Sequence, residues 1–235
     1  MKIIAILAAA GRGERLGGAK AKLWAEIGGK PLIYYSIDCI ESSSVIDGII
    51  IMVPADDITA LKNKIREWGF KKVMKILGGG ERRQDTVRIG LESLPKTCDL
   101  VMIHDAARPL ASPALFARVV EAARRAGAAT AAIQPVDTIV QIGDAGAIEY
   151  LDRSRLRHIQ TPQAFKVKII REAHARALKE GVVGTDDAGL VLRIGQKIEI
   201  IAGEAWNFKV TSPEDLARLE HALRMGAIAL FDENC

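Results

Sequence analysis

MKIIAILAAAGRGERLGG (Met1–Gly18) joins an apolar run to a loop rich in glycine and arginine. The run is short and ends at small residues, which is typical of a buried strand. Small residues in the following loop let backbone N–H groups approach an anion closely. Arg12, Arg15, Lys20 and Lys22 add positive charge within the same loop. The stretch therefore predicts a strand followed by a phosphate-binding loop.

The loop fits neither of two common nucleotide-binding motifs. A Rossmann G-x-G-x-x-G pattern needs a third glycine where Leu16 stands. A Walker A pattern needs Lys and then Ser or Thr after Gly18, but Ala19 follows and no hydroxyl is placed for magnesium. Phosphate binding here must use another arrangement.

Strand and helix patterns alternate along the rest of the chain. The near-continuous apolar strands indicate a parallel sheet covered on both faces. We therefore expect an α/β fold, a Rossmann-like, mostly parallel sheet with helices on both faces, in a single domain spanning 1–235. After the first strand, strands are expected at 48–53, 72–77, 99–104, 129–136 and 197–202, and helices at 31–40, 58–69, 85–94, 112–127, 166–179, 187–194 and after 212–215.

The alternation is interrupted between Asp137 and Gln160. Two strand-like segments flank the turn GDAG, which predicts a β-hairpin projecting from the main domain. The alternation of strands and helices does not account for this subregion, 137–160.

Composition excludes several classes of protein. The net charge is +4, but aromatic residues make up 5% and no Lys/Arg block exceeds two in a row, which disfavours a nucleic-acid binder. No apolar run approaches the roughly 18 residues of a membrane span. Cys39, Cys98 and Cys235 are far apart, which excludes a zinc cage and fits a reducing cytoplasm.

The carboxyl ends of parallel strands meet at one edge, where ligands bind in open α/β sheets. There the sequence places three loops, GGGERRQDTV (78–87), HDAARP (104–109) and the segment with Asp137 and Thr138. Asp105 is the expected magnesium ligand, since magnesium takes one or two carboxylates together with substrate phosphates. This rim predicts a site for a nucleoside triphosphate and a second anion.

The motifs AAAGRGERLG, GGGERRQDTV, HDAARP, LDRSRLRHIQTPQAF, TDDA and NFKVTSPEDL occur in this order. Together they resemble the 2-C-methyl-D-erythritol 4-phosphate cytidylyltransferase family of the non-mevalonate isoprenoid pathway, over nearly the whole chain. The resemblance implies a magnesium-dependent reaction of CTP with methylerythritol phosphate that releases pyrophosphate. A substrate phosphate would attack the α-phosphorus of CTP directly.

The resemblance also implies roles for individual residues. The expected catalytic residues are Arg15, Lys22 and Lys209. CTP would be held by Ala8, Ala9, Ala10, Gly11, Gly80, Glu81, Thr86, Asp105 and Ala106, with Asp105 on magnesium. Methylerythritol phosphate would be held by Arg108, Thr138, Arg153, Thr161 and Thr185. The hairpin at 137–160 resembles the family's dimerisation arm, which would lend Arg153 to the neighbouring subunit of a homodimer.

The chain departs from the family where Ala21-Lys22-Leu23-Trp24 replaces the usual Pro-Lys-Gln. Lys20 or Lys22 could therefore be the catalytic lysine, and the spacing to the following IGGKPL favours Lys22. Two alternatives stay open, a ribitol-5-phosphate cytidylyltransferase and a non-catalytic nucleotide-binding module. The second alanine of HDAARP disfavours the first, and Arg15 with Asp105 disfavours the second. We expect no second catalytic domain after Cys235.

Overall fold

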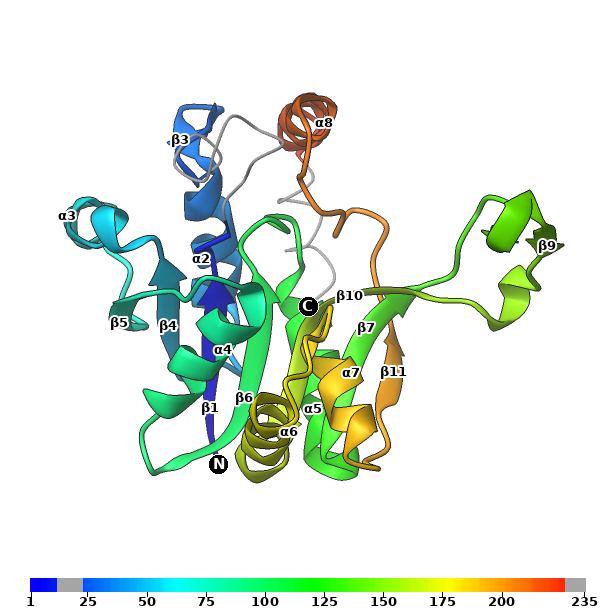
Figure 1. Ribbon diagram of the computed structural model, residues 1–235. Helices are drawn as coiled ribbons and strands as arrows, with labels where there is room; N and C mark the ends of the chain where they lie inside the picture. Colours follow the sequence, from blue (N-terminus) through cyan, green and yellow to red (C-terminus); the bar gives the residue numbers. More distant parts are fainter. Residues whose placement is uncertain (12–22, 227–235) are drawn as a thin grey trace.

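The computed structural model describes residues 1–11 and 23–226. Its core is a seven-stranded sheet in the order β11-β7-β10-β6-β1-β4-β5 (Figure 1). β1 pairs in parallel with both β4 and β6, and only β10 runs antiparallel to its neighbours β6 and β7. The strands are β1 (Lys2–Ala8), β4 (Gly48–Val53), β5 (Val73–Gly78), β6 (Cys98–Asp105), β7 (Ala128–Ile133), β10 (His158–Lys166) and β11 (Glu199–Ala202).

Helices cover both faces of this sheet, as the apolar strands predict. Alternate residues of β1 point to opposite sides, so that Ile3, Ala5 and Leu7 join one core cluster while Ile4 and Ile6 join the other. The first cluster is closed by α2 (Leu32–Ser42), α3 (Ile58–Trp68) and α5 (Pro113–Ala126). The second is closed by α4 (Arg83–Glu92), α6 (Val167–Lys179) and α7 (Asp187–Arg193).

Local sequence signals set the helix ends. The Ser112 hydroxyl accepts a hydrogen bond from the Leu115 N–H at the start of α5, and Gly127 ends that helix with φ 93°. Ser212 and Asp215 form a capping box at the start of α8 (Pro213–Arg224). Helix α8 packs in a third cluster against Ile27 of the short strand β2 (Glu26–Ile27). β2 pairs with the short strand β3 (Lys30–Pro31), and neither strand was predicted.

The segment predicted as a hairpin does leave the body of the molecule (Figure 1). β8 (Val140–Ile142) pairs antiparallel with β9 (Ile148–Tyr150), and the single-turn helices η3 (Asp144–Gly146) and η4 (Arg153–Arg155) complete it. We call residues 137–157 the arm. The predicted range 137–160 was too long at its end, because His158–Gln160 already belongs to β10.

β10 is the main difference between the predicted and the observed sheet. The sequence predicts a helix from Lys166 but no strand over 161–165, where Pro162 interrupts the apolar pattern. The strand forms nevertheless, and its register against β7 shifts between Ile159 and Gln163. A proline, which lacks an N–H donor, is tolerated at such an interruption of the ladder.

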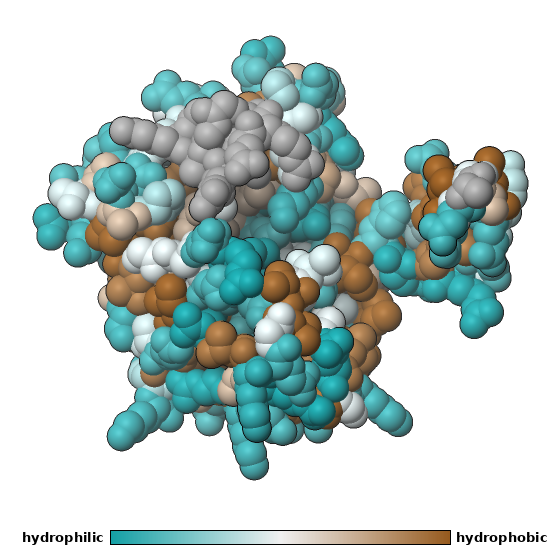
Figure 2. Space-filling model, in the orientation of Figure 1, coloured by the Kyte–Doolittle hydropathy of each residue, from teal (hydrophilic) through white to brown (hydrophobic). Residues whose placement is uncertain are grey.

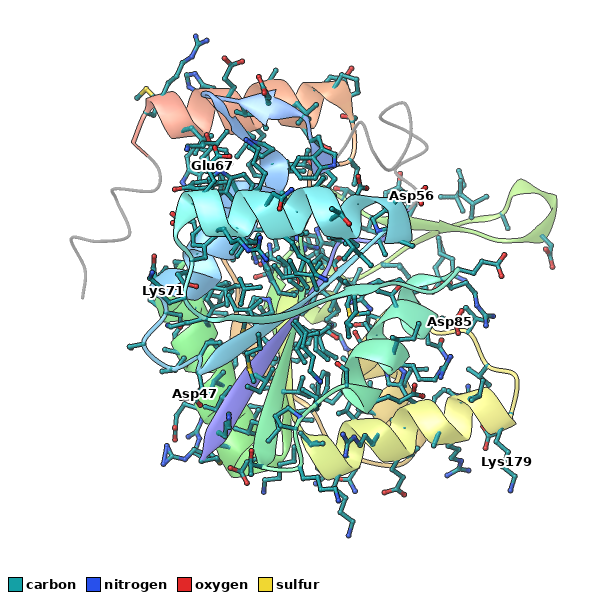
Figure 3. The ribbon with its side chains drawn as sticks, turned by 90° about the vertical axis from the view of Figure 1, so that its left-hand side faces the viewer. Asp47, Asp56, Glu67, Lys71, Asp85 and Lys179 are labelled. Carbon is teal, nitrogen blue, oxygen red and sulfur yellow. The ribbon has the colours of Figure 1, made fainter. Side chains whose placement is uncertain are left out.

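The carboxyl ends of the parallel strands define one rim of the molecule. Figure 3 shows Asp47, just before β4, and Asp56, just after it, at opposite ends of the sheet, with Asp85 on the side of Asp56. In the view of Figure 2, hydrophilic side chains gather in a shaded hollow above α4, on this same rim. Within the described residues, no helix is long and apolar enough to cross a membrane.

Candidate active site

Asp105 lies at the carboxyl end of β6, beside the end of β1, and is held by two cationic side chains. Its Oδ1 accepts a hydrogen bond from Arg83 Nε at 2.9 Å, and its Oδ2 accepts one from Lys209 Nζ at 2.7 Å. Arg83 opens α4, whereas Lys209 follows Asn207 on the segment after β11. The fold thus gathers three distant parts of the sequence around one carboxylate.

Burial and the neighbouring cations have opposite effects on the pKa of the Asp105 carboxyl. Burial alone raises the pKa of Asp105, but the Arg83 and Lys209 cations outweigh it and hold the pKa well below its usual range. The same pairing raises the pKa of Arg83, against the effect of its burial. The two cations therefore favour the ionised form of Asp105.

Arg83 contacts a second carboxylate. Its Nη1 donates to Asp187 Oδ2 at 2.7 Å, and His174 Nε2 donates to Asp187 Oδ1 at 2.9 Å. Asp187 and His174 are almost fully buried. A continuous line of hydrogen bonds therefore runs from Lys209 at the rim to α6 inside the molecule.

Buried hydrogen bonds link Asp105 to Thr161, and Thr161 to His104. The Thr161 hydroxyl accepts from the Asp105 N–H at 3.0 Å and lies 3.1 Å from His104 Nδ1. His104 Nε2–H donates to the Arg108 carbonyl at 3.0 Å, so Nδ1 is the acceptor and the threonine donates to it. Burial lowers the pKa of His104 to about 4. This histidine is neutral and enclosed, which excludes it as an acid or base for substrate.

The two glycine-rich loops touch each other. A Cβ added at Gly79 would lie 2.2 Å from the Ala10 Cβ, and one added at Gly80 would lie 2.5 Å from the Asp85 Cβ. The Thr86 hydroxyl accepts from the Gly80 N–H at 3.1 Å and donates to the Arg82 carbonyl at 3.1 Å. Only a hydrogen therefore fits between the two loops at Gly79, and only a hydrogen fits at Gly80, against Asp85 of its own loop.

The ends of β1 and β6 are joined as well. The Ala106 N–H donates to the Ala8 carbonyl at 3.0 Å, and the Ala9 N–H donates to the Met52 carbonyl at 2.8 Å. Ala10 and Gly11 lie beyond these bonds, at the start of the loop. Glu81 is exposed at the facing loop. Among the residues expected to hold CTP, the structure therefore brings Ala8–Gly11, Gly80, Thr86, Asp105 and Ala106 to one edge.

The residues expected to hold the second substrate are more scattered. Arg108 is largely buried, and its Nη1 donates to the Asn207 carbonyl at 2.7 Å. Thr185 is exposed just before α7, whose N-cap is Asp186. Thr138 is exposed at the start of the arm, and Arg153 lies further along the arm, bonded to the Val136 carbonyl. The arm, to which Arg153 belongs, projects away from the main body of this chain (Figure 1).

Arg15, Lys20 and Lys22 lie outside the described residues, so their predicted roles stay predictions. The sequence interpretation missed Asp187 and His174 altogether. It placed Arg82 and Arg83 together at the rim without separating them, whereas in the structure Arg82 is exposed and pairs with its neighbour Asp85. Nothing in a single sequence distinguishes the two arginines, because the partners of Arg83 are 22 and 104 residues away.

A magnesium ion could be held here only with help from a substrate. Within the described part of the chain, no group of three or more His, Cys, Asp or Glu side chains could hold a metal. Asp105 offers hard oxygen atoms, and each carboxylate oxygen can accept more than the one bond that it makes here. This donor set fits magnesium, which is commonly bound by one carboxylate together with substrate phosphates.

The fold is that of an α/β nucleotidyltransferase. The family model of 2-C-methyl-D-erythritol 4-phosphate cytidylyltransferase matches residues 3–225, and the chain belongs to this family. A curated member from Dictyoglomus thermophilum is 40% identical over 94% of this chain and 96% of its own length. Another from Syntrophus aciditrophicus is 37% identical over 95% and 96%.

Solved structures agree with this assignment. The 4-diphosphocytidyl-2C-methyl-D-erythritol synthase of Anaerococcus prevotii superimposes with a TM-score of 0.85 at 29% identity, covering 95% of this chain and 96% of that one. The 2-C-methyl-D-erythritol 4-phosphate cytidylyltransferase of Thermus thermophilus gives a TM-score of 0.77 at 31% identity, covering 95% and 100%. The mostly parallel sheet predicted from the sequence is confirmed.

Proposed function

We propose that the rim around Asp105 is where this chain performs the reaction of its family. The chain joins CTP and 2-C-methyl-D-erythritol 4-phosphate to give 4-diphosphocytidyl-2-C-methyl-D-erythritol and pyrophosphate. The observation that carries the location is the placement of Asp105 between Arg83 and Lys209, beside the glycine-rich loops.

The nucleophile is a phosphate oxygen of methylerythritol phosphate, which attacks the α-phosphorus of CTP while the bond to pyrophosphate breaks. A phosphate monoester has a second pKa near 6 and is mostly dianionic at neutral pH. No general base is required. The burial and neutrality of His104, the histidine nearest to Asp105 in the sequence, support this conclusion.

The difficulty is electrostatic, because a dianion approaches a triphosphate. Fixed cations reduce this repulsion and stabilise the charge that spreads over the five-coordinate phosphorus. The Lys209 side chain is 42% exposed and reaches the rim, so its ammonium group can move from Asp105 to an incoming phosphate. Arg15 and Lys22 are proposed to neutralise the triphosphate from the first loop, and Arg108 and Thr185 to position the acceptor.

Asp105 would hold magnesium together with phosphate oxygens of CTP. The ion would supply charge neutralisation at the phosphates. Ala8–Gly11 and Gly80 with Thr86 would hold the cytosine and ribose, since small residues allow close approach to the backbone. Glu81 and Ala106 are proposed to complete this pocket.

The arm is proposed to join two copies of the chain. Its apolar side chains are unusually exposed, with Ile142 at 72%, Ile148 at 64% and Tyr150 at 77%, and Figure 2 shows hydrophobic surface on the arm, away from the main body. An isolated two-stranded hairpin is at best marginally stable, so a second copy would bury this surface. The partner would then receive Arg153, and Thr138 would lie at the base of the contact.

The arm proposal predicts the oligomeric state. Ile142→Asp combined with Ile148→Asp should convert a dimer to a monomer in sedimentation velocity and lower kcat. Leu178→Asp is the matched control, because Leu178 is 58% exposed on α6. A double variant that sediments like the wild type would refute dimerisation through the arm.

We further propose a cytoplasmic location, which the free thiols of Cys39 and Cys98 support.

Pyrophosphate release from CTP and magnesium tests the reaction, with methylerythritol phosphate and ribitol 5-phosphate compared as acceptors. We expect turnover with methylerythritol phosphate. Asp105→Asn should abolish this turnover, whereas Asp99→Asn, at an exposed residue near the opposite end of β6, should not. Turnover with ribitol 5-phosphate alone would make ribitol 5-phosphate the acceptor. No pyrophosphate release with either compound would favour a nucleotide-binding module.

A further inference from the structure

We propose that Arg83 is a positioning residue for the reaction, which fixes the Asp105 carboxylate by bridging it to the buried carboxylate of Asp187. This inference rests on the proposed role of Asp105. Arg83 acts through that residue and needs no contact with either substrate.

The geometry of the bridge orients Asp105. The Nε and Nη1 atoms of one planar guanidinium bind the two carboxylates, at 2.9 Å to Asp105 Oδ1 and 2.7 Å to Asp187 Oδ2. A planar guanidinium that binds both carboxylates fixes the position of one relative to the other, whereas the ammonium group of lysine is a single flexible point charge. Asp105 Oδ1 is therefore fixed, and Oδ2 is the oxygen that faces the exposed Lys209.

Asp187 anchors the bridge inside the protein. Its side chain is 1% exposed and lies in the first turn of α7, where carboxylates are favoured by the helix dipole. His174 on α6, 2% exposed, donates to its other oxygen. Because Asp187 is buried and its Oδ1 is bonded to His174, Arg83 has a fixed point from which to hold Asp105.

The two cations on Asp105 thus have different roles. Among the residues that the structure describes, Lys209 is bonded to Asp105 alone, and it is partly exposed, so it can leave when a phosphate arrives. Arg83 is 26% exposed and bonded at two atoms, so it stays. With Arg83 in place, Asp105 keeps its orientation and its charge compensation after Lys209 has moved.

A direct test must separate this role from simple stability, because removing Arg83 leaves Asp187 as an unpaired buried charge, which strongly destabilises proteins. Arg83→Gln combined with Asp187→Asn removes both charges and keeps hydrogen-bonding groups at both positions. Asp187→Asn alone keeps the bond from Arg83 to Asp105 and is the reference. Arg82→Gln is the matched control, since Arg82 is exposed and pairs with its neighbour Asp85.

We expect Arg83→Gln to lower Tm and the double variant to recover it towards Asp187→Asn. The double variant should nevertheless show kcat about 10- to 100-fold below that of Asp187→Asn, the loss expected for a charge-assisted hydrogen bond, with a smaller change in KM for CTP. Arg82→Gln should stay within about twofold of wild type. A stable double variant with kcat within threefold of Asp187→Asn would overturn the proposal.

If the double variant fails to fold, Arg83→Lys decides the question, because it keeps the charge but not the planar guanidinium. A kcat about tenfold below wild type at unchanged Tm supports positioning, and a kcat within twofold overturns it. Asp105→Asn, assayed in parallel, separates the two proposals. Full activity in that variant refutes the role of Asp105, whereas its inactivity beside an active double variant refutes only that of Arg83.

Discussion

Thr161→Val tests whether the threonine hydroxyl serves the protein or the substrate. The residue was predicted to bind methylerythritol phosphate, yet its side chain is buried and its hydroxyl bonds both the Asp105 N–H and His104 Nδ1. Valine has nearly the same shape, so the change leaves one buried donor and one buried acceptor without partners. Each unsatisfied group costs about 1–3 kcal/mol, and the methyl group regains part of this.

We therefore expect the free energy of unfolding to fall by about 2–4 kcal/mol. For a chain of this size, that corresponds to a decrease in Tm of about 4–16 °C. Thermal and urea unfolding measure it, and Thr161→Ser, which keeps the hydroxyl, should recover most of the loss. A valine variant with wild-type Tm but a raised KM for methylerythritol phosphate would refute this reasoning and make the hydroxyl a substrate ligand.

Three further predictions concern the loops and the buried thiol. Arg15→Ala or Lys22→Ala should lower kcat on the order of 10³-fold while CTP binding falls less, and a near-normal kcat in steady-state assays would remove that residue from catalysis. Gly79→Ala should raise KM for CTP and lower stability by about 1–3 kcal/mol, because its Cβ would meet Ala10 at 2.2 Å. Gly78→Ala, whose nearest contact is 3.8 Å, is the control that should differ little from wild type. Burial raises the pKa of Cys39 to about 12, so this thiol stays protonated at pH 8 and should react with iodoacetamide only after unfolding; labelling of the native protein at Cys39, located by mass spectrometry, would contradict this.

The layered fold could be predicted because its signals are local. Apolar runs such as Gly48–Val53, and helix caps such as Ser112 with Gly127, specify their elements whatever lies elsewhere. β10 could not be predicted, because its pairing with β6 and β7 depends on residues about 30 to 60 positions away and Pro162 hides the pattern.

Some parts of the candidate site could likewise be predicted from the sequence, and others could not. The loops around Gly80 and Asp105 were found because parallel strands bring their carboxyl ends together. The bridge from Arg83 to Asp187 was not, because an ion pair across 104 residues leaves no mark on sequence periodicity. Thr161 was expected to face the substrate, whereas both hydrogen bonds of its hydroxyl are made within the protein, a difference that only side-chain geometry could reveal.

The antiparallel insertion of β10 also has a consequence for the order in which the chain is made. During synthesis, residues 1–126 can already pair β6, β1, β4 and β5, but one edge of β6 must wait for β10, more than fifty residues later. An unpaired, apolar edge strand is a template for aggregation. The emerging chain is therefore most vulnerable while the arm is being translated, and nascent chains that stop before His158 should depend most on chaperones.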